Sequence, residues 1–102
     1  MTTERFRVKL LPAAEKDLEK LGQPEERIIE ILTELETNPR KGDALTGALR
    51  GSRALKFSLS GSGAYRAAYV ITGQTCVVYY IGTRENAYPE IARRARRLPL
   101  MD

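Results

Sequence analysis

The stretch RALKFSLSGSGAYRAAYVITGQTCVVYYI, residues 53–81, decides the fold class of this 102-residue chain. Apolar and polar residues alternate along it with the period of two that is typical of half-buried β-strands. The predicted strands lie at residues 53–60, 65–71 and 75–81. Glycine-containing segments at 61–63 and 72–74 separate them and predict tight turns. Three consecutive strands joined in this way predict an antiparallel meander.

The chain before residue 53 has the spacing of amphipathic helices, preceded by one further strand. Pro12 suits the first turn of a helix that Gly22 ends, and the pair Asn38-Pro39 ends a second helix. A short helix with four arginines on its polar side follows the last strand. The predicted elements outside the meander are a strand at residues 3–11, helices at residues 12–21 and 24–37, and a final helix at residues 89–98.

The element order is therefore β-α-α-β-β-β-α, which predicts an α+β fold. The sheet is expected to be antiparallel and four-stranded, with the first strand added to the three strands of the meander. The two N-terminal helices are expected to form a hairpin on one face of this sheet, and a short helix ends the fold. Because the chain has neither linkers nor repeats, residues 1–102 are expected to form a single domain.

The residue types that the chain lacks exclude several kinds of site. It contains one cysteine and no histidine, so an internal disulfide, a Ser-His-Asp triad and a histidine metal cage are impossible. Acid–base chemistry would fall to Asp, Glu, Lys, Tyr or Arg, and we expect neither a metal nor another cofactor. No apolar run approaches the roughly 20 residues of a membrane span, and the N-terminus lacks the apolar region of a signal peptide. We therefore expect a soluble, cytoplasmic protein that does not contact a membrane.

The net charge of +4 is unevenly distributed along the chain. Residues 1–37 carry six basic and nine acidic side chains, whereas residues 38–102 carry eleven basic and four acidic ones. An acidic first third and a basic remainder predict one cationic face, which is typical of proteins that bind nucleic acid. The alternative is a solvated surface whose charge imbalance has no function.

Alternation along the meander predicts which basic side chains share a surface. If the leucines and the phenylalanine of residues 55–59 face the helices, Lys56 points to the other face. On the next strand, Arg66 takes the same outward side when the tyrosines around it point inward. Arg84 directly follows the third strand, and Tyr88 comes four residues later. These cations are therefore expected to converge, although each of them alone would also fit a solvated surface residue.

Several motifs, in this order, resemble the RelE/ParE superfamily of bacterial and archaeal toxins from toxin–antitoxin systems. The matching pieces are AAEKDLEKLG (13–22), LETNPR (35–40), LRGSRALKFSL (49–59), GAYRAAYVI (63–71) and VVYYIGTRENAY (77–88). The resemblance implies a small toxin that a separate antitoxin neutralises by covering its active face. Within the superfamily, the RelE branch cleaves mRNA in the ribosomal A site, whereas the ParE branch poisons DNA gyrase without cleaving RNA.

The resemblance also implies a catalytic site for RNA cleavage. Lys56 corresponds to the first of two strand lysines in the RelE branch, and Ser58 stands where the second would be. Arg66 and Arg84 match catalytic arginines, a residue type that clamps a transferring phosphate well. Tyr88 is the nearest candidate for the catalytic tyrosine, at a shorter spacing from Arg84 than RelE toxins have.

Three hypotheses about function remain open at this point. The first is an mRNA interferase that acts on the ribosome and inhibits translation, with mRNA, the ribosome and an acidic segment of a cognate antitoxin as partners. The second is a toxin directed at DNA gyrase, which Ser58 and the short spacing between Arg84 and Tyr88 favour. The third is a member of the superfamily that binds an antitoxin or nucleic acid without catalysis. Further candidates for RNA contacts are Arg53, Arg93, Arg94, Arg96 and Arg97.

Overall fold

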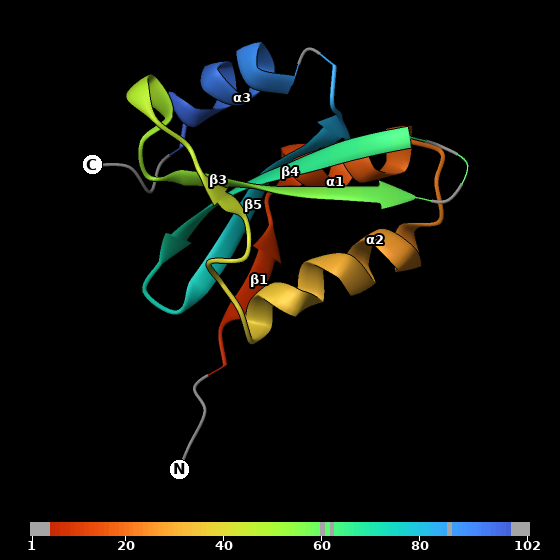
Figure 1. Cartoon of the computed structure of the whole chain (residues 1–102), viewed down its shortest axis with the longest axis horizontal. Coiled ribbons are helices and arrows are strands. Elements are labelled where there is room, and N and C mark those ends of the chain that lie inside the picture. Colours follow the sequence, from red (N-terminus) through yellow and green to blue (C-terminus); the bar gives the residue numbers. More distant parts are fainter. Residues whose placement is uncertain (1–4, 60, 62, 86, 99–102) are drawn as a thin grey trace.

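The computed structural model describes residues 5–59, 61, 63–85 and 87–98 of the chain. In this part, five strands form one sheet, with two helices on one face and a third on the other (Figure 1). The strands are β1 (Arg7–Leu10), β2 (Asp43–Ala44), β3 (Ser52–Leu59), β4 (Gly63–Thr72) and β5 (Thr75–Thr83). The helices are α1 (Pro12–Lys20), α2 (Glu25–Leu32) and α3 (Ala87–Ala95), and 3₁₀ turns occupy Thr33–Glu36 and Gly47–Leu49. None of the described helices has the length and apolar character needed to cross a membrane.

The predicted antiparallel meander is confirmed. β3 pairs with β4 and β4 pairs with β5, both antiparallel, so that Lys56 lies opposite Arg66 and Arg66 lies opposite Gly82. The turn between β4 and β5 contains Gly73 with a φ of 60°, a left-handed conformation that glycine adopts without strain. The turn predicted at residues 61–63 includes Ser62, which lies outside the described residues.

The prediction of a four-stranded, wholly antiparallel sheet is wrong in two respects. The sheet has five strands in the order β1-β5-β4-β3-β2, and β1 pairs with β5 in parallel. Because helices follow β1, no tight turn fixes its direction, and its alternating pattern is the same in either orientation. β2 has two residues, too few to show any periodicity in a sequence. Of the strand predicted at 3–11, residues 7–10 form β1, and Thr3 and Glu4 lie outside the described residues.

The face of the sheet under α1 and α2 holds the larger core, as the alternation predicts. Leu55, Phe57 and Leu59 of β3 are buried there together with alternate residues of β4. Apolar side chains from both helices complete this core. Lys56 and Ser58, between the buried residues of β3, are exposed. A shift of one residue in register would exchange the two sets, so burial of the apolar set fixes the outward position of Lys56.

The other face of the sheet is covered by α3, and a bulge in β5 adapts the sheet to it. Tyr69 pairs with Val78 and Ala68 pairs with Tyr80, so Tyr79 is an extra residue on β5. Tyr79 and Tyr80 consequently both point toward α3, whereas regular alternation would turn one of them to the opposite face.

The helix predicted at residues 89–98 is present but shifted toward the N-terminus. It begins at Ala87, and Pro89 fits into its first turn because the N–H groups there have no acceptor within the helix. Ala87, Ile91 and Leu98 are buried between α3 and the sheet. This start places Tyr88 in the first helical turn, directly above the end of the meander.

Candidate functional site

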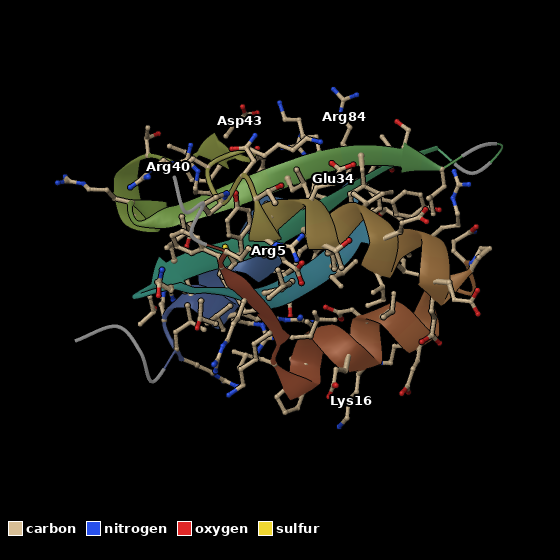
Figure 2. All side chains as sticks on the ribbon, turned by 90° about the horizontal axis from the view of Figure 1, so that it is seen from below. Arg5, Lys16, Glu34, Arg40, Asp43 and Arg84 are labelled. Atoms are coloured by element: carbon tan, nitrogen blue, oxygen red, sulfur yellow. The ribbon has the colours of Figure 1, made fainter. Side chains whose placement is uncertain are left out.

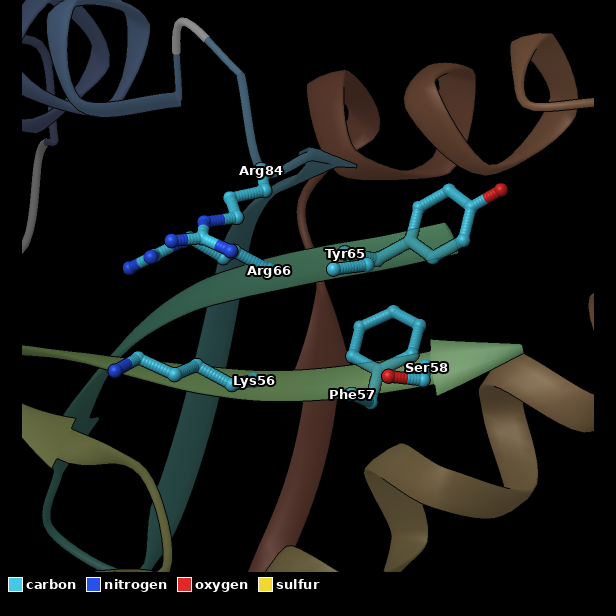
Figure 3. A pocket seen from close by; sticks show the side chains of 7 residues that line it. Lys56, Phe57, Ser58, Tyr65, Arg66 and Arg84 are labelled. Atoms are coloured by element: carbon cyan, nitrogen blue, oxygen red, sulfur yellow. The ribbon is translucent and has the colours of Figure 1, made fainter. Parts of the chain in front are cut away.

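A pocket of about 310 Å³, which we call the cationic pocket, opens beside β3, β4 and the end of β5. Its lining residues are Lys56, Phe57, Ser58, Ala64, Tyr65, Arg66 and Arg84. Figure 3 shows the side chains of Lys56, Arg66 and Arg84 extending toward the same side, away from the rings of Phe57 and Tyr65. Among the described residues, no acidic one lines the pocket, so three positive charges face one space. No three acidic or cysteine side chains of the described ranges lie close enough to share a metal ion.

Adjacent strands of the meander bring these three cations together. Lys56 of β3 is directly opposite Arg66 of β4 in the strand register. Arg84 follows β5, and its backbone N–H donates to the Ala64 carbonyl at 3.1 Å, which holds it beside β4. Like charges on neighbouring strands repel one another, and an anionic ligand would relieve this repulsion. The structure thus unites the cations that alternation assigned to one surface, and their catalytic role stays a prediction.

Tyr88 joins this group from the first turn of α3. The guanidinium of Arg66 donates a hydrogen bond to the Tyr88 phenol oxygen. It also lies over the Tyr88 ring, with its central carbon 4.8 Å from the ring centroid. Tyr88 is 42% exposed, whereas Nε of Arg66 is buried and lacks a hydrogen-bond partner among the described residues. Despite the shorter spacing from Arg84, the tyrosine therefore contacts Arg66, although it is not one of the residues that line the pocket.

The structure adds one residue that sequence reasoning missed, Asp43 on β2. Its Oδ2 atom lies 3.3 Å from Nζ of Lys56, and both side chains are largely exposed. Asp43 and Arg84 extend along the same margin of the molecule, on the side away from Lys16 of α1 (Figure 2). A strand of two residues gives no periodic signal, so no pattern in the sequence pointed to this carboxylate.

Buried hydrogen bonds fix the segment that carries Asp43 to the sheet. The phenol of Tyr69 donates to the Pro39 carbonyl at 2.6 Å and accepts the Gly42 N–H at 2.9 Å. Burial raises the pKa of Tyr69, and the hydrogen bond from Gly42 opposes this rise. A Cβ atom at Gly42 would lie 2.9 Å from the Tyr69 phenol and from the backbone of Ala54, so this close approach requires glycine.

Arg53, predicted to contact RNA, holds the same segment from the other side. Its Nε atom donates to the Gly42 carbonyl at 2.8 Å, and one terminal nitrogen donates to the Arg40 carbonyl at 3.1 Å. The guanidinium is thus engaged by backbone carbonyls, and it does not line the cationic pocket. Its contact with RNA stays a prediction.

The four C-terminal arginines differ in how they are paired. Arg94 forms ion pairs with carboxylates of α1 and α3, and Arg93 pairs with Glu90 within α3. Hydrogen bonds from Arg93 and Arg94 lower the pKa of Glu90 to about 2. Arg96 and Arg97 follow α3, are exposed, and have no ion pair in the described part of the chain. An RNA contact by any of the four stays a prediction.

The fold is shared with small toxins from toxin–antitoxin systems, and sequence comparison shows the family. Residues 8–92 match the family model of the ParE-like toxin of type II bacterial toxin–antitoxin systems. The chain therefore belongs to this family, and its resemblance to the RelE/ParE superfamily is confirmed. No curated protein sequence matches the chain.

Solved structures of RelE toxins share the fold. A mutant of E. coli toxin RelE in the free state is 24% identical with a TM-score of 0.70, over 91% of this chain and 96% of that one. The isolated E. coli RelE toxin is 25% identical with a TM-score of 0.61, over 91% of this chain and 99% of that one. A chain of the RelBE2 toxin–antitoxin complex from Mycobacterium tuberculosis is 24% identical with a TM-score of 0.66, over 78% of this chain and 99% of that one.

Proposed function

We propose that this toxin is a ribosome-dependent mRNA interferase. The observation that carries the proposal is the convergence of Lys56, Arg66 and Arg84 on one pocket, with the Tyr88 phenol bonded to Arg66. Three cations without a lining carboxylate suit a phosphate of the RNA backbone. A lysine and a tyrosine beside two guanidinium groups supply side chains that can move protons, in a chain that has no histidine.

The chemistry that this set supports is an internal transesterification of RNA. The 2′-oxygen of one nucleotide attacks the adjacent phosphorus, the bond from phosphorus to the 5′-oxygen breaks, and the products are a 2′,3′-cyclic phosphate and a 5′-hydroxyl. The proton of the 2′-hydroxyl leaves to a base, and the departing 5′-oxygen takes up a proton from an acid. Arg66 and Arg84 bind the non-bridging oxygens and stabilise the negative charge that grows in the transition state. Lys56 and Tyr88 are the side chains that would serve as base and acid.

The cognate antitoxin is proposed to neutralise the toxin by covering the cationic pocket. The comparison structures include toxin–antitoxin complexes, RelBE2 of Mycobacterium tuberculosis and the intact RelBE complex of E. coli. An acidic segment of the antitoxin complements the three cations of the pocket, and adjacent apolar contacts would bring the affinity into the nanomolar range, about −12 kcal/mol. A protein that acts on ribosomes and mRNA works in the cytoplasm, which is where we place it.

Inhibition of DNA gyrase is the second candidate function. Ser58 is exposed in the pocket at the position where the RelE resemblance implies a second lysine, which removes one cation from the RNA site. The family model that the chain matches also bears the name of the ParE-like toxins, the branch whose target is DNA gyrase. A toxin without any catalysis is the outcome that remains if neither activity is found.

The deciding experiment measures both activities with one preparation. Purified toxin is added to ribosomes that translate a reporter mRNA, and primer extension maps the new 5′ ends. We expect cleavage that requires ribosomes, is lost in Arg66→Ala, and is retained in Arg7→Ala, an exposed arginine on β1 at the opposite edge of the sheet. Absence of cleavage by the parent protein, together with inhibition of gyrase supercoiling, would establish the second candidate instead.

Ser58→Lys sharpens this test. A lysine at this position adds a cation beside Lys56, on the same outward face of β3, and stabilises charge that builds on the phosphate. We expect ribosome-dependent cleavage to increase by several-fold, roughly the effect of one exposed charge–charge interaction. Ser58→Gln adds a side chain of comparable length without the charge and serves as the control. Equal cleavage by both variants would contradict an electrostatic role for this position.

A further inference from the structure

Asp17 of α1 and Arg94 of α3 form an ion pair that joins distant parts of the chain. The two terminal nitrogens of Arg94 donate to the two carboxylate oxygens of Asp17, at 2.5 and 3.0 Å. The side chains of Arg94 and Asp17 are only 19% and 14% exposed. A two-pronged pair of this kind fixes the angle between its partners as well as their separation.

Both partners of this ion pair are also bonded to the sheet. Oδ2 of Asp17 accepts the backbone N–H of Ile81 at 3.0 Å, and Arg94 donates to the Tyr79 carbonyl at 3.1 Å. The strand pairing of β1 with β5 ends at Val78, so the Ile81 N–H lies beyond it. The ion pair therefore links α1, β5 and α3 at one point, three residues before Arg84.

Tyr88 depends on α3 for its position. It is 42% exposed, and its described contact is with the guanidinium of Arg66. α3 has nine residues, too few for an isolated helix to be stable, so its orientation follows from what packs against it. The apolar contacts of Ala87 and Ile91 exclude water but are not directional, and a modest tilt of the helix would preserve them. Arg94 supplies the directional contact, about 9 Å along the helix axis from Tyr88.

We propose that Asp17 and Arg94 are positioning residues: their ion pair sets the orientation of α3 and thereby holds the Tyr88 phenol on Arg66. Neither residue lines the cationic pocket, and nor does Tyr88, so an effect on the pocket passes from Tyr88 through its contact with Arg66. The catalytic consequence rests on the proposed function. The position of Tyr88 can be measured without catalysis, which keeps the two proposals separable.

The direct test uses the protein labelled with 3-fluorotyrosine and fluorine NMR. The chain has five tyrosines, and Tyr88→Phe identifies the resonance of Tyr88 by its loss. We expect Arg94→Lys to move this resonance toward its position in Arg66→Ala, where the contact with the guanidinium is absent. If Arg94→Lys does not fold, Asp17→Asn decides the matter, because it removes the charge but keeps an oxygen for the Ile81 N–H.

The matched control is Arg93→Lys. Arg93 precedes Arg94 on α3 but donates to Glu90 of its own helix, so it does not tie α3 to α1 or to the sheet. We expect it to leave the Tyr88 resonance in place. A folded Arg94→Lys protein with an unmoved Tyr88 resonance would overturn the proposal.

The kinetic test asks whether the ion pair acts through Tyr88 or only through stability. We expect Arg94→Lys to lower ribosome-dependent cleavage roughly tenfold in the parent protein, and by less than about twofold when Tyr88→Phe is already present. Equal losses in the two backgrounds would contradict positioning of Tyr88. If the parent protein does not cleave mRNA at all, the proposed function fails, and the fluorine measurement still decides the positioning.

Discussion

The cationic pocket and the Asp17–Arg94 ion pair both depend on arginine, but they leave the guanidinium groups in opposite states. In the described part of the chain, neither Arg66 nor Arg84 pairs with a carboxylate. Every side-chain nitrogen of Arg94, in contrast, donates to an oxygen of Asp17, Glu90 or the backbone. A fully engaged guanidinium holds parts of the fold together, whereas one left open among other cations suits a ligand from outside.

This difference predicts opposite consequences of losing an arginine. Removing a cation from the pocket relieves repulsion between like charges, so the fold should tolerate it while ligand binding and catalysis suffer. Removing Arg94 leaves the mostly buried carboxylate of Asp17 without its partner, so the fold should lose stability.

Arg84→Ala should abolish most of the activity while leaving the fold intact. Loss of one preorganised donor to a transition state typically lowers the rate by about 100- to 1000-fold. We expect this loss in ribosome-dependent cleavage of a reporter mRNA, with a melting temperature equal to or slightly above that of the parent protein. Arg7→Ala, an exposed arginine far from the pocket, should change neither quantity. Full cleavage by Arg84→Ala would refute the site.

Arg94→Ala should have its main effect on stability. Breaking a buried ion pair by removing one partner usually destabilises a protein by about 3–5 kcal/mol, and the partial exposure of this pair reduces the expectation to about 2–3 kcal/mol. Urea denaturation measures the free energy of unfolding directly. Arg93→Ala is the control, because its pair with Glu90 is exposed and lies within α3, and it should have a clearly smaller effect. Equal destabilisation by both substitutions would contradict a structural role that is specific to Arg94.

The fold could be predicted from the sequence wherever periodicity and turns act together. The meander follows from alternation in residues 53–81 and from the glycine-containing turns, and burial of Leu55 and Phe57 fixes which face Lys56 occupies. The direction of β1 could not be predicted, because no hairpin joins it to β5. β2 was too short to detect, and the bulge at Tyr79 breaks the alternation that the prediction relied on.

The candidate site could be predicted only in part, and the reason is separation along the chain. Lys56 and Arg66 lie on neighbouring strands and Arg84 directly follows the next one, so alternation and the order of the strands were enough to bring them together. Asp17 and Arg94 are 77 residues apart, and no local pattern relates a helix near the N-terminus to one near the C-terminus. In the sequence, Arg94 was one of four similar arginines, and only the structure distinguishes the one that is engaged.

Glu90 predicts how the ion pairs of α3 respond to acid. Hydrogen bonds from Arg93 and Arg94 lower its pKa from an ordinary value of 4.5 to about 2 in the folded protein. Because the folded pKa lies below the unfolded one, this contribution to stability is fully present above about pH 4.5 and disappears as the pH falls toward 2. Urea denaturation at several pH values should show a steeper acid-induced loss in the parent protein than in Glu90→Gln. Identical pH dependence in the two proteins would contradict this account.

Asp43→Asn should have the smallest effect. Whether it strengthens or weakens RNA binding tests whether the cations of the pocket are free to bind a ligand. The carboxylate is 3.3 Å from Lys56 but both groups are exposed, so it competes only weakly with an incoming phosphate. We expect Asp43→Asn to bind a labelled single-stranded RNA roughly twofold more tightly at low salt, and equally at about 0.5 M salt, where screening removes the difference. Glu19→Gln on α1 changes the net charge identically at a distance and should leave the affinity unchanged. Weaker binding by Asp43→Asn would instead mean that the carboxylate orients Lys56 toward the RNA. The cationic pocket would then depend on the Asp43–Lys56 ion pair, as α3 is proposed to depend on the Asp17–Arg94 pair.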